Sequence, residues 1–179
     1  MWCLVLQVCS ICTLAQEPKQ QQDSSSCQKF TQEFFDWYAP LTQPRENTSV
    51  AAAQRKIRQH EPEVLDPKLL RALRADDEAQ ERAKGEIVGL DFDPFVGSQD
   101  PADHYETRKL SLEGNKCSVE VWRASPSDTA EKSDKPDVVA EVVRQNGHWR
   151  FVNFRYPQLN ADLLNVLASL AKNRSQPAN

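Results

Sequence analysis

Two short turn signals constrain the fold of this 179-residue chain more than any other feature of its sequence. Gly114-Asn115 and Asn146-Gly147 each stand between two segments in which apolar and polar residues alternate. A two-residue turn of this composition accepts the positive φ angles that join neighbouring strands in an antiparallel hairpin. The sequence therefore predicts four antiparallel strands, at residues 105–113, 116–123, 138–145 and 148–156.

The last of these strands is rich in aromatic residues. Strict alternation divides it into one face with Trp149, Phe151 and Asn153 and another with Arg150, Val152, Phe154 and Tyr156. Aromatic residues then fall on both faces, so we expect this strand to be central or covered on both sides.

Helical patterns precede and follow the strands. Apolar rings recur at helical spacing at Phe30, Phe34, Trp37 and Tyr38, and Asp66-Pro67 is a favoured helix start. A second apolar stripe follows within residues 161–172. The order of elements predicts an α+β fold, with N-terminal helices and a C-terminal helix packed on a curved antiparallel sheet.

The first fifteen residues contain no Asp, Glu, Lys or Arg and end in Thr13-Leu14-Ala15. This pattern predicts a secretory signal peptide at residues 1–15, with an uncleaved anchor or a buried helix as alternatives. Neither Cys9 nor Cys12 follows a small residue, so we expect export to the periplasm or the exterior without a lipid anchor. The further expectation is a disordered leader at 16–26, one domain at 27–173, a flexible tail at 174–179, and no stable membrane span after processing.

Only Cys27 and Cys117 remain after removal of residues 1–15. An oxidising compartment would permit a disulfide between them, and the alternative is a buried strand thiol at Cys117 with a loop thiol at Cys27. The sequence leaves both open. It contains no Cys/His cluster, so we expect no metal site and no cofactor. The net charge of -4 argues against a nucleic-acid partner.

Residues 90–100 (LDFDPFVGSQD) concentrate three carboxylates between the helical and the strand-rich parts. An EF-hand loop starting at Asp91 fails because Phe95, Val96 and Ala102 occupy positions that need a ligand, a glycine and a glutamate. We interpret the segment as a rigid corner, in which Asp side chains cap turns and Phe92 and Phe95 contact the core.

Two kinds of functional site remain as hypotheses. A carboxylate in an apolar pocket could serve as a catalytic base, and the candidates that lie close in sequence are Asp91, Asp93, His104 and Tyr105. A binding module without chemistry would instead use the concave face of the sheet, with Trp122, Arg150 and Arg155 as contact residues. For Trp149 and Phe151 we favour a place in the core.

Three segments in order resemble the family called domain of unknown function 3828: residues 34–38 (FFDWY), residues 90–100 and residues 147–156 (GHWRFVNFRY). The resemblance spans roughly residues 28–172. It implies an exported bacterial protein with a cone-like fold similar to nuclear transport factor 2, and it brings no catalytic residue. We therefore expect a non-enzymatic module of the cell envelope that binds a small apolar ligand or an envelope protein. The alternative is an isomerase- or dehydratase-like enzyme that uses a pocket Asp and His.

Overall fold

The computed structural model describes residues 19–43, 50–60, 62–83, 85–124 and 134–176. Its elements are α1 (Lys19–Thr42), α2 (Val50–His60), the 3-10 helix η1 (Pro62–Val64), α3 (Pro67–Arg82), β1 (Tyr105–Glu113), β2 (Lys116–Arg123), β3 (Val138–Gln145), β4 (His148–Tyr156), β5 (Ala161–Asp162) and α4 (Leu163–Arg174). The predicted signal peptide lies outside the described residues.

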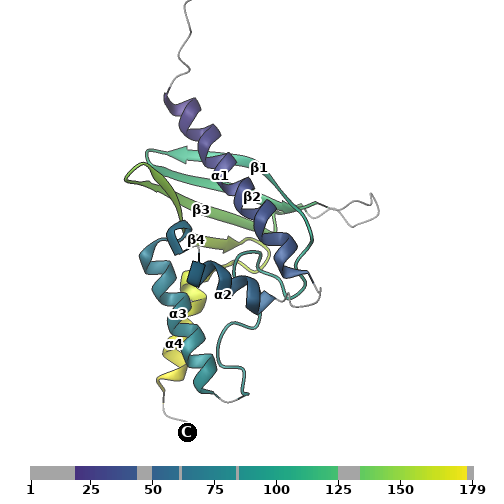
Figure 1. Ribbon diagram of the computed structural model, residues 1–179, viewed down its shortest axis with the longest axis vertical. Helices are drawn as coiled ribbons and strands as arrows, with labels where there is room; N and C mark the ends of the chain where they lie inside the picture. The colour runs from purple at the N-terminus through teal and green to yellow at the C-terminus, as the bar shows by residue number, and fades with distance from the viewer. Residues whose placement is uncertain (1–18, 44–49, 61, 84, 125–133, 177–179) are drawn as a thin grey trace, which may run out of the picture.

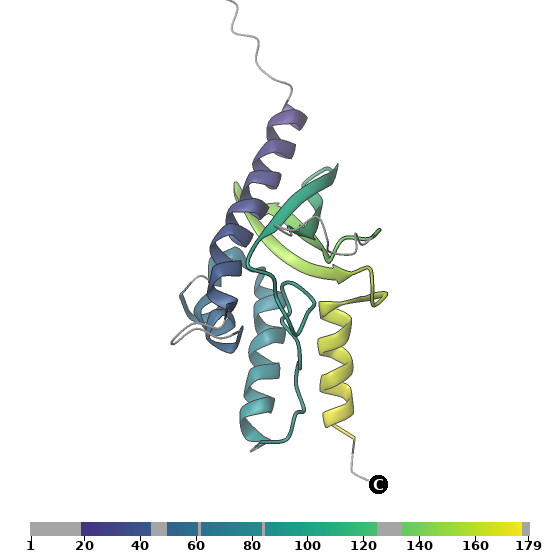
Figure 2. The same ribbon diagram turned by 90° about the vertical axis from the view of Figure 1, so that its right-hand side faces the viewer.

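The strands form one antiparallel sheet in the order β1-β2-β3-β4-β5. Figure 1 shows α1 crossing the sheet, with α2, α3 and α4 gathered beyond β4. Figure 2, turned by 90°, places α1 on one side of the sheet and leaves the opposite side of β1–β3 without a helix. The predicted α+β fold with helices on an antiparallel sheet is confirmed.

The core lies between α1 and the sheet. Phe34 of α1 packs against Phe95 and Phe151 at ring-centroid distances of 5.7 and 4.7 Å. From the sheet, Cys117, Val119 and Val121 of β2 are at most 1% exposed. Alternation along β2 thus turns every second residue into the core, which is the arrangement that the sequence predicts.

β4 departs from strict alternation. Glu141 pairs with Asn153 and Val142 with Phe151, so a bulge at Val152 interrupts the register. Beyond the bulge Phe154 and Tyr156 turn to the same face as Trp149 and Phe151, and all four side chains are at most 9% exposed. The prediction of aromatics on both faces is wrong, because one inserted residue reverses the alternation for the rest of the strand. Trp149 and Phe151 belong to the core.

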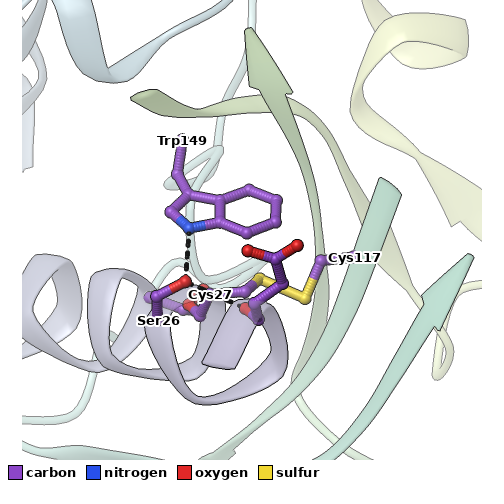
Figure 3. Close-up of a disulfide and its surroundings, with 6 residues drawn as sticks. Ser26, Cys27, Cys117 and Trp149 are labelled. Atoms are coloured by element: carbon purple, nitrogen blue, oxygen red, sulfur yellow. Dashed lines mark hydrogen bonds between the residues drawn. A yellow bond between two sulfur atoms is a disulfide. The ribbon is translucent and has the colours of Figure 1, made fainter. Parts of the chain in front are cut away.

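The helix α1 begins at Lys19, so the predicted disordered leader is wrong for residues 19–26. Tertiary contacts hold these first turns in place. Asp23 forms an ion pair with Arg144 of β3, and the Trp149 Nε1–H donates to Ser26 Oγ at 3.1 Å (Figure 3). The amino-acid composition of the segment does not indicate such long-range contacts.

The two cysteines form a disulfide that joins α1 to β2, so of the two alternatives the structure has the bond. Figure 3 shows it beside Ser26 and Trp149. Both residues are at most 1% exposed. The bond thus closes a long loop inside the core, between segments separated by 90 residues.

The predicted flexible tail is wrong at its first residue. Arg174 ends α4, and its Nη1 donates to Asp76 Oδ1 at 2.6 Å and to the Val88 carbonyl at 2.8 Å. Asp76 is 5% exposed, so this ion pair is largely shielded from solvent and fixes the end of α4 against α3.

Removing the disulfide should lower stability strongly. Closing a loop of about 90 residues reduces the entropy of the unfolded chain, which corresponds to about 4–5 kcal/mol. We expect the double variant Cys27→Ala/Cys117→Ala to lose roughly that much free energy of unfolding in urea titrations. Wild-type protein unfolded under reducing conditions serves as the control. An unchanged midpoint in both would contradict a bond formed in the native protein.

Candidate functional site

The segment between α3 and β1 is a tight corner centred on Asp93. The Asp93 carboxylate accepts hydrogen bonds from the Tyr38 hydroxyl at 2.6 Å and from the Phe95 N–H at 2.8 Å. Its backbone pairs with Ser98. Asp93 is 1% exposed, so a carboxylate ties the corner to α1 inside the core.

Tyr156 and Gly97 complete the corner. The Tyr156 hydroxyl donates to the Pro94 carbonyl at 2.6 Å. Gly97 has φ of +65°, and a Cβ at this position would lie 2.6 Å from Cδ1 of the Tyr156 ring. Glycine is therefore required here both for the backbone conformation and for the close approach of the ring.

Burial raises the pKa of Asp93 to about 6, and the hydrogen bonds from Tyr38 and from the backbone of Phe95 and Val96 act in the opposite direction. Burial also raises the pKa of Tyr38 well above its usual value. The perturbed carboxylate resembles a catalytic base in its pKa alone. Its oxygens are already engaged by protein donors in a core filled with aromatic rings.

The other predicted catalytic candidates do not gather around Asp93. Asp91 is exposed and accepts a 3.4 Å hydrogen bond from Gln99, and His104 is also exposed. The Tyr105 hydroxyl accepts from the Ala102 N–H at 2.8 Å, and burial raises the Tyr105 pKa to about 12. Asp91 and Tyr105 thus hydrogen-bond within or to the loop between α3 and β1, in agreement with our interpretation of the segment as a rigid corner.

The three predicted binding residues do share one surface. We call it the outer face, meaning the side of the sheet turned away from α1. Register places on it Ser111, Ser118, Glu120, Trp122, Val139, Glu141, Val143, Arg150, Asn153 and Arg155. Trp122 comes from β2 and the two arginines from β4, so the predicted residues lie on two strands that are separated by β3.

Trp122 is held by its neighbours. The Arg108 guanidinium lies 4.8 Å from the centre of the Trp122 ring, a cation–π arrangement. Its indole N–H donates to Glu120 at 3.3 Å. The ring is only partly buried, so a large apolar surface with a fixed orientation remains within reach of solvent.

The arginines of β4 have different surroundings. Arg155 forms an ion pair with Glu141 at 2.8 Å. Arg150 Nε is buried and has no hydrogen-bond partner, the one such side-chain atom among the described residues. A buried donor without an acceptor costs about 1–3 kcal/mol. An acceptor from a partner that reached Arg150 Nε after rearrangement of the side chain would remove this cost.

The outer face is hollowed in two places that meet at Arg155. A depression of about 380 Å³ lies over β1–β4 and includes Lys116, Ser118 and Glu141. A second of about 710 Å³ lies between the end of β4 and α4, and includes Asp162 and Asn165. The depression over β1–β4 has a mainly polar lining, whereas apolar surface makes up the larger share of the one beside α4. Such a mixture of polar and apolar surface is typical of protein interfaces.

Sequence reasoning missed Arg108 and Glu141 as parts of this surface. Strand alternation places Glu141 on the face opposite to Val142 of the core and could have identified it. Arg108 lies at a second bulge, between Thr107 and Leu110, and no sequence pattern indicates that bulge.

Within the described ranges no group of three or more His, Cys, Asp or Glu side chains is arranged to hold a metal ion. A search of those same residues finds no helix with both the length and the apolar character needed to cross a bilayer.

Comparisons with known proteins give one structural similarity. No protein-family model matches the chain, and no curated protein matches its sequence. A chain in the crystal structure of the type VI native effector–immunity complex Tae3–Tai3 from Ralstonia pickettii aligns with 76% of this chain and 97% of its own length. The identity is 18% and the TM-score 0.49, so function has to be argued from the chain's own residues. The resemblance to domain of unknown function 3828 stays a prediction.

The raised pKa of Asp93 predicts a pH-dependent stability. Because its pKa is higher in the native state than in the unfolded chain, the native state is favoured below pH about 4 and loses this advantage as pH rises through about 6. The full change is up to roughly 3 kcal/mol. We expect the substitution Asp93→Asn to remove this pH dependence, while the new side-chain amide keeps hydrogen bonds to Tyr38 and to the Phe95 N–H. Urea unfolding of both proteins between pH 4 and 7 measures the difference, and a constant difference would contradict the raised pKa.

Gly97→Ala should destabilise the protein by about 2–4 kcal/mol, since it combines left-handed backbone with a clash against Tyr156. Gly114→Ala is the matched control, because Gly114 has φ of +62° and nothing lies within 4 Å of the place that its Cβ would take. Thermal unfolding of both variants separates the two effects. Equal losses would show that the Tyr156 contact contributes nothing.

Proposed function

We propose that this chain is a non-enzymatic protein-binding module that holds its partner on the outer face. The observation that carries the proposal is a partly exposed Trp122, fixed between Arg108 and Glu120, on a sheet face that no described helix covers over β1–β3. Tryptophan and arginine are the residues that most often dominate the energy of a protein interface.

The charges on the outer face indicate the chemistry of the partner. Glu141 neutralises Arg155, whereas Arg150 Nε has no acceptor and Arg150 has no ion-pair partner among the described residues. A carboxylate from the partner would satisfy that guanidinium, and an apolar group would cover the Trp122 ring. The register places Arg150 level with Lys116, at the opposite end of β2 from Trp122. We therefore infer a protein partner that covers the length of the outer face, with an acidic side chain at the Arg150 end and an apolar one at the Trp122 end.

We further propose that the protein is exported to the bacterial envelope. It is supported by the uncharged apolar pattern of residues 1–15 and by the resemblance to the exported family. The Cys27–Cys117 disulfide fits an oxidising compartment, because structural disulfides are rare in reducing ones.

Binding measurements on surface variants test the proposal. The purified protein is used to capture partners from a bacterial envelope extract, and the affinity of each captured and purified protein is then measured by calorimetry. We expect Trp122→Ala and Arg150→Glu each to weaken binding about tenfold or more, the loss typical of an interface hot spot.

Trp37→Ala is the matched control, because Trp37 is also a partly buried tryptophan with a cation beside its ring, in this case Lys56 on the helical side of the molecule. It should leave the affinity unchanged. A partner that binds the two outer-face variants as tightly as wild type, but not the Trp37 variant, would contradict the proposal. Circular dichroism confirms that each variant is folded.

A further inference from the structure

The strand β1 forms an edge of the sheet. A side chain of α1 provides hydrogen-bond partners only for the outward backbone groups in the first half of this strand. The Gln32 side-chain amide donates to the Tyr105 carbonyl at 2.9 Å and accepts from the Thr107 N–H at 2.8 Å. It thus occupies the place that a peptide group of a neighbouring strand would take. The bulge between Thr107 and Leu110 ends this protected part of the edge.

Beyond the bulge the edge is open. Gly114-Asn115 forms a two-residue turn, so Glu113 and Lys116 exchange hydrogen bonds across the hairpin, as do Ser111 and Ser118. The backbone groups of Leu110 and Leu112 consequently point away from β2. No described strand lies on that side of β1, and both leucine side chains are only partly buried.

The open segment, residues 110–113, together with Lys109 at the end of the bulge, has a sequence that complements itself. It reads Lys-Leu-Ser-Leu-Glu, so an antiparallel copy places lysine opposite glutamate, leucine opposite leucine and serine opposite serine. Lys109 and Glu113 are exposed, and neither forms an ion pair with another described residue. Opposite charges in cross-strand pairs stabilise a sheet, whereas like charges destabilise it.

We propose that two copies of this protein pair through residues 109–113 of their β1 strands, about a two-fold axis at Ser111. Leu110 of each copy then exchanges backbone hydrogen bonds with Leu112 of the other. Lys109 of each copy faces Glu113 of the other. The two five-stranded sheets become one continuous sheet.

Several features favour a second copy over an unrelated segment. The same five residues supply both sides of the contact, and an isologous interface requires such self-complementarity. The bulge and the Gln32 side chain limit the pairing to residues 109–113, the segment that is complementary to an antiparallel copy of itself. Pairing of the two β1 strands takes place in the plane of the sheet and leaves the outer face uncovered. The proposed dimer is therefore independent of the proposed binding function.

Sedimentation velocity over a range of protein concentrations tests the pairing through a charge swap. We expect wild-type protein to form dimers in a concentration-dependent manner. Lys109→Glu and Glu113→Lys alone should each weaken the dimer about tenfold, because every substitution places two pairs of like charges opposite each other. The double variant Lys109→Glu/Glu113→Lys should restore dimerisation to within about threefold of wild type, since both pairs are again opposite in charge.

Lys68→Glu is the control, because Lys68 is exposed in the first turn of α3, away from β1. Hydrogen exchange provides a second readout: the amides of Leu110 and Leu112 should gain protection as dimers form, while the amide of Thr107 stays unchanged. A wild-type protein that remains monomeric at millimolar concentration would overturn the inference. So would a double variant no better than the single ones.

Discussion

The fold depends on the aromatic contact between α1 and β4. Phe34 lies against Phe151, and Phe95 from the corner packs against Phe34 and against Phe154. These rings join a helix, a loop and a strand that are far apart in the sequence. The disulfide holds the same helix to β2, so α1 is fixed to the sheet both by packing and by a covalent bond. Most side chains of β2, β3 and β4 that face α1 therefore lie in the core.

The packing of α1 on one face of the sheet separates residues that hold the fold together from candidate functional residues. Asp93 has the perturbed pKa that often marks an active site, yet Tyr38 and Phe95 engage its oxygens within the packed core. Trp122 and Arg150 lie instead on the sheet face that α1 does not cover. The charged corner at residues 90–100 holds the fold together, whereas no described helix covers the outer face over β1–β3.

Local sequence patterns predicted the parts of the structure that depend on local physics. The turns at Gly114-Asn115 and Asn146-Gly147 defined both hairpins, and Asp66 caps α3 by accepting from the Lys68 N–H. The bulge at Val152 was not predictable, because it arises from packing of Phe154 and Tyr156 against the core. The Tyr38–Asp93 bond and the disulfide join residues 55 and 90 positions apart, a range over which no periodicity extends. Of the candidate site, alternation located Trp122 and Arg155 on their strands, but only the three-dimensional register showed that they share a face.

We propose that the protein meets its partner through the face of the sheet opposite α1. Site-specific photochemical cross-linking in intact cells tests it most directly, with a photoreactive phenylalanine analogue placed at Trp122 on β2 or at Lys29 on the exposed side of α1. A partner bound on the outer face gives a discrete protein adduct from position 122 and none from position 29. Adducts from position 29 alone would contradict the proposal.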